Sequence, residues 1–239
     1  MNTPSDFGPI YAETLEGLTL GRFPTEPWNT FSNLIFLALA LHLAFLTKLD
    51  RKKHPLIVCS LPVLLVGWVG GTIYHGTRSH SVWLIMDFVP IGLLSFAAAL
   101  TFWYRLTNRW IHSVALLLLV LIVGRVAVEY LIVDRGIKIS MGYVSFAISL
   151  LLPITLIVAK EARDLWVWLV MTALSFTTAI ICRSLDKDHL LPMGTHFLWH
   201  LFGGLSVWFL MILVYRLNDN RRLVLDMNTT QARYFKSGL

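Results

Sequence analysis

The chain has 239 residues, of which 56% belong to the apolar set AVILMFWYC and only 14% are charged, and its mean hydropathy is +0.66. A soluble protein of this size needs more charged residues to cover its surface, and its two cysteines are too few for a disulfide framework. The net charge of +6 does not indicate a nucleic-acid partner, because the cations lie in short loops between apolar runs. The composition therefore indicates a multi-pass membrane protein.

We expect three regions: an extracytoplasmic N-terminal segment (1–27), a transmembrane domain (28–216) and a cytoplasmic tail (217–239). The first ten residues are polar and lack the features of a cleaved signal peptide. Backbone polar groups cannot stay unpaired in lipid, so every span must be a helix, and a span needs about 20 apolar residues. The predicted fold is an all-α, seven-transmembrane helix bundle with spans at 28–47, 55–74, 82–104, 110–133, 137–159, 165–183 and 196–216.

The loop charges predict the orientation of these spans. The loops after the first, third and fifth spans, together with the tail, hold thirteen Lys and Arg residues, against six on the opposite side. Because short cytoplasmic loops are enriched in these residues, the N-terminus is expected outside and the C-terminus in the cytoplasm.

Ionisable residues inside spans are costly and are functional hypotheses by default. With this orientation, His75 ends the second span, Asp87 lies early in the third, and His196 and His200 begin the seventh. The four side chains should therefore share one depth near the outer face.

His196 and His200 form an H-x-x-x-H pair, which places both imidazoles on one helix face. With His75 as a third nitrogen ligand, the set predicts a catalytic zinc site with a position left for water. Asp87 would orient that water, take its proton or hold a histidine tautomer. The plainer interpretation is that such histidines are hydrogen-bonded packing residues.

Two further groups allow more than one interpretation. Arg125 and Glu129, four residues apart in the fourth span, predict a buried ion pair or else the lining of a polar cavity. Glu13, Glu16 and Glu26, with nearby amide oxygens, offer the oxygen ligands that calcium prefers.

Three blocks of the sequence resemble the alkaline ceramidase family, part of a superfamily of seven-span membrane hydrolases that includes the adiponectin-type receptors. The first runs from Tyr11 to Glu13 and resumes in the E-P-W-N-T-F-S-N segment at 26–33. The second is His75 with the later D-F-V-P-I segment at 87–91, and the third combines Arg183 and Asp186 with P-M-G-T-H-F-L-W-H at 192–200.

The resemblance implies zinc held by His75, His196 and His200, Asp87 beside the metal-bound water, and hydrolysis of a lipid amide such as ceramide. It also implies calcium near the N-terminal segment, with Glu13, Glu26 and Asn29 as candidate ligands. The chain departs from the family at Gly71, where a serine usually stands one turn before the first histidine. Thr72 lies three residues before His75 and is expected to replace that hydroxyl in part.

The function expected is therefore an intramembrane, zinc-dependent lipid amide hydrolase that cleaves ceramide or a similar lipid to a fatty acid and an amine. The alternative is a receptor-like or sensor member of the same superfamily that keeps the metal but turns over little or no substrate. A transporter is disfavoured because no matching pair of Gly/Pro-broken spans occurs. The partners expected are the bilayer and a ceramide-like lipid, in a bacterial inner membrane or a eukaryotic endoplasmic reticulum or Golgi membrane, while protein partners are unknown.

Overall fold

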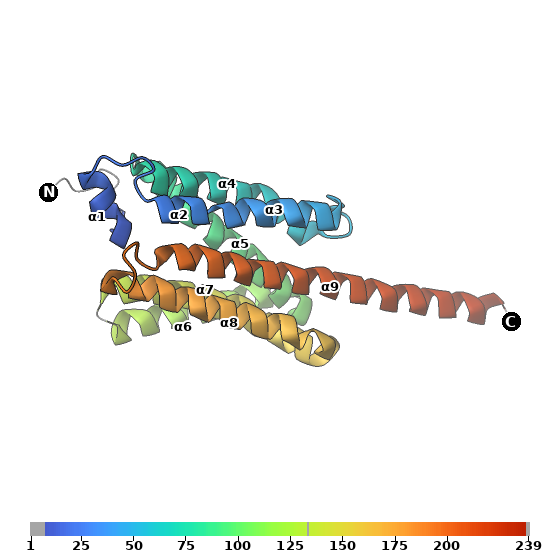
Figure 1. Ribbon diagram of the computed structural model, residues 1–239. Coiled ribbons are helices and arrows are strands. Elements are labelled where there is room, and N and C mark those ends of the chain that lie inside the picture. Colours follow the sequence, from blue (N-terminus) through green and yellow to red (C-terminus); the bar gives the residue numbers. More distant parts are fainter. Residues whose placement is uncertain (1–7, 133, 238–239) are drawn as a thin grey trace.

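The computed structural model describes residues 8–132 and 134–237, and the regular structure of these residues is helical throughout. Single 3-10 turns at Arg163–Leu165 and Asp186–Asp188 flank the eighth helix. The helices are α1 (Ala12–Thr19), α2 (Pro27–Ser32), α3 (Leu34–Thr47), α4 (Pro55–Thr77), α5 (Ser81–Thr107), α6 (Trp110–Leu131), α7 (Arg135–Glu161), α8 (Trp166–Leu185) and α9 (His196–Ser237) (Figure 1).

Among the described residues, seven helical segments are long and apolar enough to cross a membrane, which confirms the predicted all-helical, seven-span fold. Each observed segment agrees with its predicted span to within five residues at either end. Helices α2 and α3 together form the first of them, Pro27–Thr47. Helix α9 continues beyond the last span as one helix to Ser237, past the rest of the bundle, so the described part of the predicted tail (217–239) is helical (Figure 1).

Successive long helices alternate in direction, so the chain returns repeatedly to the end of the bundle where α1 lies. We call this the α1 end. It holds the end of α4, the beginning of α5 and the beginnings of α7 and α9 (Figure 1). The apolar core lies between the helices and includes the fully buried side chains of Leu43, Ile57, Ile154 and Leu213. Packing of this core sets the relative depth of the helices and therefore of the polar residues at the α1 end.

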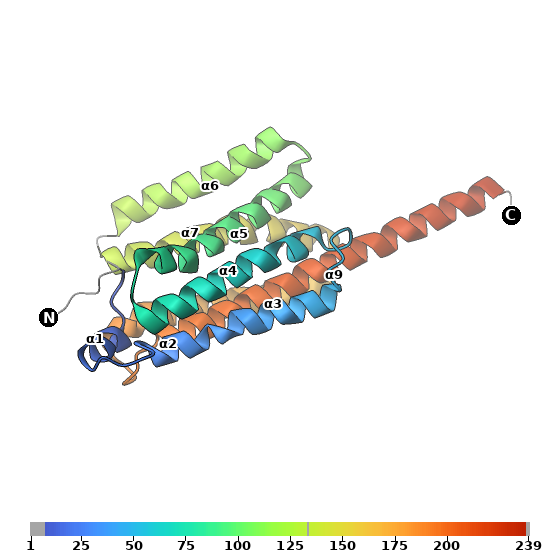
Figure 2. The same cartoon turned by 90° about the horizontal axis from the view of Figure 1, so that it is seen from above.

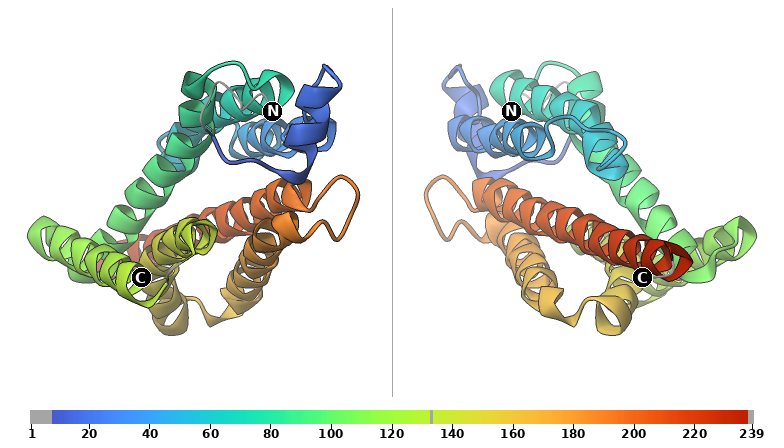
Figure 3. Two further views of the ribbon diagram at one scale, coloured as in Figure 1. Left: turned by 90° about the vertical axis from the view of Figure 1, so that its left-hand side faces the viewer. Right: turned by 90° about the vertical axis from the view of Figure 1, so that its right-hand side faces the viewer.

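Helix α6 lies at the edge of the bundle and packs against α5 and α7 (Figures 2 and 3). Its position corrects one prediction, because Arg125 and Glu129 are not a buried pair. They form an ion pair of 3.4 Å between side chains that are 73% and 50% exposed. Glu129 also pairs with Lys138 of α7 at 2.7 Å. We call these three residues the α6–α7 cluster. It lies on the outer surface of the bundle and lines neither of the cavities described below.

Candidate metal centre

Three buried histidines from two distant parts of the chain meet at the α1 end. His75 lies in the last turn of α4, while His196 and His200 occupy the first two turns of α9. One nitrogen from each ring lies within 4.8 Å of the others, which would allow one metal ion to be held by all three. The sequence-based prediction that these residues converge is confirmed.

The tautomer of His75 is fixed by Glu26, the residue that precedes α2. The Nδ1 atom of His75 lies 2.5 Å from Oε2 of Glu26, and both side chains are fully buried. A carboxylate only accepts hydrogen bonds, so Nδ1 carries the proton and donates it. The lone pair is then on Nε2, which is buried and has no hydrogen-bond partner. An orphaned buried nitrogen aimed at two other imidazoles is what a metal ligand requires.

Ser32 fixes the tautomer of His200 in the same way. The hydroxyl of Ser32 donates its proton to the carbonyl of Asn29 at 3.0 Å, and its oxygen lies 2.7 Å from Nδ1 of His200. Because that hydroxyl has only one proton, its oxygen accepts from Nδ1 of His200. Nε2 of His200 is then the free nitrogen. Two of the three rings are thus oriented by partners that leave Nε2 available.

The third ring, that of His196, is held by stacking. The ring of Tyr11 lies 3.7 Å from it, centroid to centroid, at an interplanar angle of 18°, and Nδ1 of His196 is buried without a hydrogen-bond partner. Burial raises the pKa of Tyr11 above its usual range, so its hydroxyl stays protonated. The N-terminal segment therefore covers the histidines with a neutral aromatic side chain.

Asp186 positions the first turn of α9. One of its oxygens accepts from the backbone N–H of Thr195 at 2.7 Å and of His196 at 2.8 Å. The other accepts from the N–H of Ala12 at 3.0 Å. A carboxylate at this point satisfies orphan donors of the helix N-terminus and complements its dipole. It joins the N-terminal segment to the helix that carries two of the histidines.

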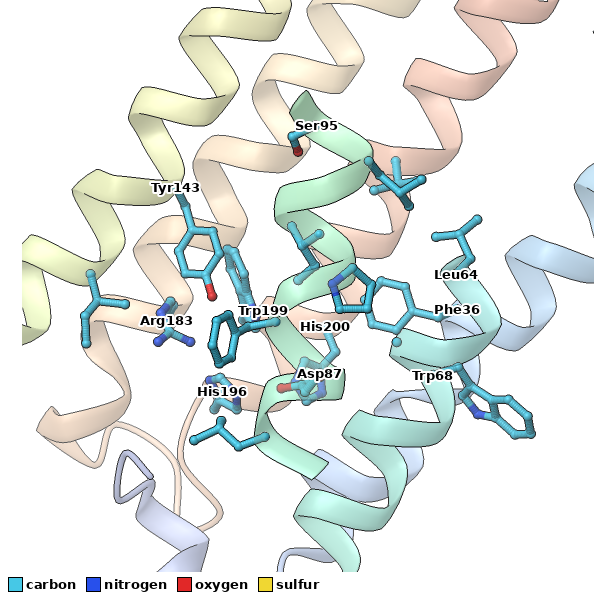
Figure 4. Close-up of a pocket in the computed structure, with 18 of the residues that line it drawn as sticks. Phe36, Leu64, Trp68, Asp87, Ser95, Tyr143, Arg183, His196, Trp199 and His200 are labelled. Atoms are coloured by element: carbon cyan, nitrogen blue, oxygen red, sulfur yellow. The ribbon is translucent and has the colours of Figure 1, made fainter. Parts of the chain in front are cut away.

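Asp87 of α5 faces the same region, as predicted. Among the described residues, no hydrogen-bond or ion-pair partner holds its carboxylate, and it lines a cavity together with His196 and His200 (Figure 4). A side chain at position 71 would meet it directly: a Cβ atom built on Gly71 would lie 2.5 Å from Oδ1 of Asp87 and 2.6 Å from Oδ1 of Asn33. A serine at position 71, which is usual in the family that the sequence resembles, would therefore crowd two side-chain oxygens.

Thr72 lines neither of the two cavities described below. Its hydroxyl is buried and has no hydrogen-bond partner among the described residues. The expected replacement of the family's serine by Thr72 stays a prediction.

The candidate calcium ligands take part in protein contacts. Glu13 accepts from the backbone N–H groups of Trp28 and Asn29 at 3.1 and 2.9 Å, which caps the beginning of α2. Burial raises the pKa of Glu13, more than these two hydrogen bonds lower it. The Oδ1 atom of Asn29 is buried and has no partner in the described part of the chain. Calcium binding by Glu13, Glu26 and Asn29 stays a prediction.

Glu26 has four partners. Besides His75, it accepts from the hydroxyl of Thr14 at 2.5 Å, from the guanidinium of Arg78 at 2.8 Å and from the amide of Asn29 at 3.1 Å. Burial alone would raise the pKa of Glu26, but the charge and hydrogen bond of His75 and the charge of Arg78 lower it below the usual range. Glu26 therefore stays ionised. We call Glu26, His75 and Arg78 the buried network.

A cavity of about 330 Å³ opens beside the histidines, and we call it the site cavity. It adjoins a second cavity of about 540 Å³, which lies farther from the α1 end and which we call the deep cavity. The two cavities share walls that include Phe36, Tyr143 and Trp199 (Figure 4). The walls of both are mainly apolar and come chiefly from α5, α7 and α9, with further residues from α3 and α8. The arrangement can place an apolar chain in the deep cavity with its polar end at the histidines.

Three glycines widen the deep cavity. Gly92, Gly142 and Gly203 line it from α5, α7 and α9, and a Cβ atom added at any of them meets no other atom within 4 Å. Larger side chains at these positions would project into the cavity without a clash. The position of these glycines on the cavity wall could not be inferred from the sequence, because a glycine in an apolar run does not reveal which face of its helix it occupies.

Sequence reasoning also missed the roles of Glu26, Ser32, Tyr11 and Tyr143. The signals were present only in part, since Glu26 and Ser32 belong to the 26–33 motif but their partners lie 49 and 168 residues away. Comparison with known proteins adds nothing to the assignment, because no protein-family model and no curated protein matches the sequence.

Proposed function

We propose that this protein is an intramembrane metal-dependent hydrolase that cleaves the amide bond of a ceramide-like lipid. One arrangement carries the proposal: His75 and His200, with Nε2 left free by their partners, and His196 lie beside an unpaired carboxylate at the mouth of an apolar cavity. Three imidazoles are the ligand set of catalytic zinc. Zinc held there would lower the pKa of a coordinated water and polarise the substrate carbonyl.

The residues of the chain would perform the remaining work. The acyl chain would occupy the deep cavity, which would hold the scissile amide beside Asp87 and exclude bulk water. Asp87 would take a proton from the attacking water while the oxygen of that water bonds to the carbonyl carbon. The same group would deliver that proton to the amine nitrogen as the C–N bond breaks. The products are a fatty acid and an amine.

Glu26 and Ser32 would act as positioning residues by holding the tautomers of His75 and His200. Lipid would enter sideways, between α5 and α7. Phe88 and Ile139 line both cavities from these two helices and remain 43% and 42% exposed. With the N-terminus outside, as the loop charges predict, the site would lie near the outer face of the membrane.

Metal analysis and lipid hydrolysis test the proposal together. We expect about one zinc per purified chain, and none in the double variant His196→Ala/His200→Ala. The wild type should release fatty acid from ceramide, and a chelator should stop this release. Asp87→Asn should keep the zinc and lose the hydrolysis. Zinc retained in full by the double variant would disprove the metal site.

Gly142→Leu tests the placement of the chain, because it narrows the deep cavity from α7, a helix that carries none of the three histidines. This variant should keep zinc and short-chain hydrolysis while losing long-chain hydrolysis. The observation that favours the receptor-like alternative is Gly71, which lacks the family's serine hydroxyl. Zinc binding without fatty acid release from any lipid of a ceramide and lysolipid panel would support that alternative instead.

A further inference from the structure

Arg183 is a cation in the wall of the site cavity that lacks an acidic partner. It lies near the end of α8 and lines the cavity together with His196, His200 and Asp87 (Figure 4). No carboxylate among the described residues forms an ion pair with it. Its guanidinium carbon lies 5.4 Å from the ring centroid of Tyr143 and 5.4 Å from that of Trp199.

Arg78, at the same end of the bundle, shows what a fully paired arginine looks like in this protein. Its guanidinium donates to Glu26 at 2.8 Å and to the carbonyl of Pro9 at 3.0 Å. It also lies 4.6 Å from the ring centroid of Tyr74. Arg183 has comparable aromatic contacts but no carboxylate. Since a guanidinium carries five N–H donors and no carboxylate of the described residues holds them, they are available to an acceptor on a molecule in the cavity.

Removing a cation from water is costly unless an anion or hydrogen-bond acceptors compensate. Aromatic rings recover part of this cost and hold the guanidinium plane in place. The fork of N–H groups then matches the oxygens of a phosphate or carboxylate in two parallel hydrogen bonds. An arginine held in this way beside a metal centre is suited to recognise an anionic group on the molecule that the cavity binds.

We propose that the preferred substrate carries an anionic headgroup, of the phosphate or carboxylate class, close to its scissile amide, and that Arg183 binds this group. This inference rests on the proposed function, and it makes a neutral ceramide the poorer substrate. Arg183, His196 and His200 line the same site cavity, while the chain would lie in the deep cavity. The anion must therefore lie only a few bonds from the carbonyl carbon.

A matched pair of lipids tests this inference by binding. Ceramide and its 1-phosphate have the same chains and differ only in a phosphate near the amide. We expect the zinc-loaded wild type in detergent micelles to bind the phosphate at least about tenfold more tightly. Arg183→Gln should remove the preference, and Arg183→Lys should keep part of it. Arg125→Gln, which removes an exposed arginine outside both cavities, should leave the preference unchanged.

Each result has a definite meaning. Equal affinity of the wild type for the two lipids overturns the anion site, and this result does not depend on whether any variant folds. An unchanged preference in Arg183→Gln with full zinc content also overturns it. If Arg183 serves only the fatty acid product, Arg183→Gln will weaken inhibition by added fatty acid and leave the preference between the two lipids as it was, which again refutes the proposal.

Hydrolysis of the same pair separates this inference from the proposed function. A phosphate preference in binding without fatty acid release from either lipid keeps the anion site and contradicts the hydrolase. Release at equal rates from both lipids, with equal affinity, keeps the hydrolase and contradicts the anion site. Faster release from the phosphate, lost in Arg183→Gln, supports both.

Discussion

Two groups of charged side chains lie at the α1 end of the bundle and are built from the same chemistry. The buried network joins Glu26 to His75 and Arg78, and the side chains in its two ion pairs are 0% exposed. The α6–α7 cluster joins Glu129 to Arg125 and Lys138, with Glu129 50% exposed. Each is a glutamate between two nitrogen-bearing side chains. Burial is therefore the property that distinguishes them.

The difference matters because exposed ion pairs are screened and contribute about 0–1 kcal/mol. A buried pair that loses one partner leaves an uncompensated charge and costs about 3–5 kcal/mol. The network also holds a histidine in the tautomer that a metal needs, whereas no residue of the α6–α7 cluster lines either cavity. The same residue types thus serve a site in one place and the surface of a helix hairpin in the other.

Neutralising Glu26 should have a far larger effect than neutralising Glu129. Glu26→Gln should lower zinc affinity about 10–100-fold and the free energy of unfolding by about 3 kcal/mol. It removes the negative charge that Arg78 and His75 share, and it leaves one acceptor oxygen where the carboxylate offered two. Glu129→Gln, the matched control, should change the free energy of unfolding by no more than about 0.5 kcal/mol. Competition with a chromogenic chelator and thermal unfolding in detergent measure the two quantities.

Equal losses in Glu26→Gln and Glu129→Gln would show that burial does not distinguish the two groups of charged side chains. Unfolding should also be measured after zinc is removed, because bound metal itself stabilises the folded state. A difference between the variants that vanishes without zinc would mean that Glu26 acts only through the metal. A difference that persists would show that the network stabilises the fold on its own.

The second expected effect concerns the space at Gly71, beside the buried network. Gly71→Ala would bring a methyl group to 2.5 Å from Oδ1 of Asp87, so the carboxylate must move, and hydrolysis should fall about tenfold or more. Gly71→Ser should retain more activity than Gly71→Ala, because its hydroxyl can donate to the oxygen that it crowds. Gly76→Ala, whose methyl group would meet Thr30 at an ordinary 3.7 Å, is the control on the same helix.

Fatty acid release from ceramide measures the three variants side by side. Full activity in Gly71→Ala would show that Asp87 need not stay where it lies, and would contradict its assignment as the proton acceptor. Equal loss in the serine and alanine variants would mean that crowding alone decides the outcome. In that case a hydroxyl at position 71 has no role in this protein.

Much of the fold and the convergence of the three histidines could be predicted from local signals. Runs of about 20 apolar residues identify spans without tertiary information, and the four-residue spacing of His196 and His200 places them on one face. His75 joined them because alternating spans return to one end of the bundle. These inferences need only lengths and directions, which the sequence contains.

Which face of a helix is buried could not be predicted in the same way. Arg125 and Glu129 have the spacing of an ion pair, and the pair exists, but α6 lies at the edge of the bundle and leaves it exposed. Glu26 suggested a calcium ligand because carboxylates clustered near it, and that prediction stays untested, but two of its four side-chain partners lie 49 and 52 positions away in the sequence. Helix position and long-range pairing decide such cases, and a single sequence specifies neither directly.

The smallest expected effect comes from Ser32→Ala, which separates positioning from charge because no ionised group is removed. Nδ1 of His200 loses its acceptor at 2.7 Å, and the ring can then protonate on either nitrogen. Zinc affinity should fall about tenfold, and the free energy of unfolding by about 1 kcal/mol.

Ser113→Ala is the control, because its hydroxyl is also buried and donates to the carbonyl of Arg109 at 2.8 Å but contacts none of the three histidines of the site. It should lose similar stability and no zinc affinity. If both serine variants bind zinc as the wild type does, the tautomer of His200 is fixed by the metal rather than by Ser32. Among the described residues, the contact of Glu26 with His75 is then the one polar contact that positions a histidine of the site.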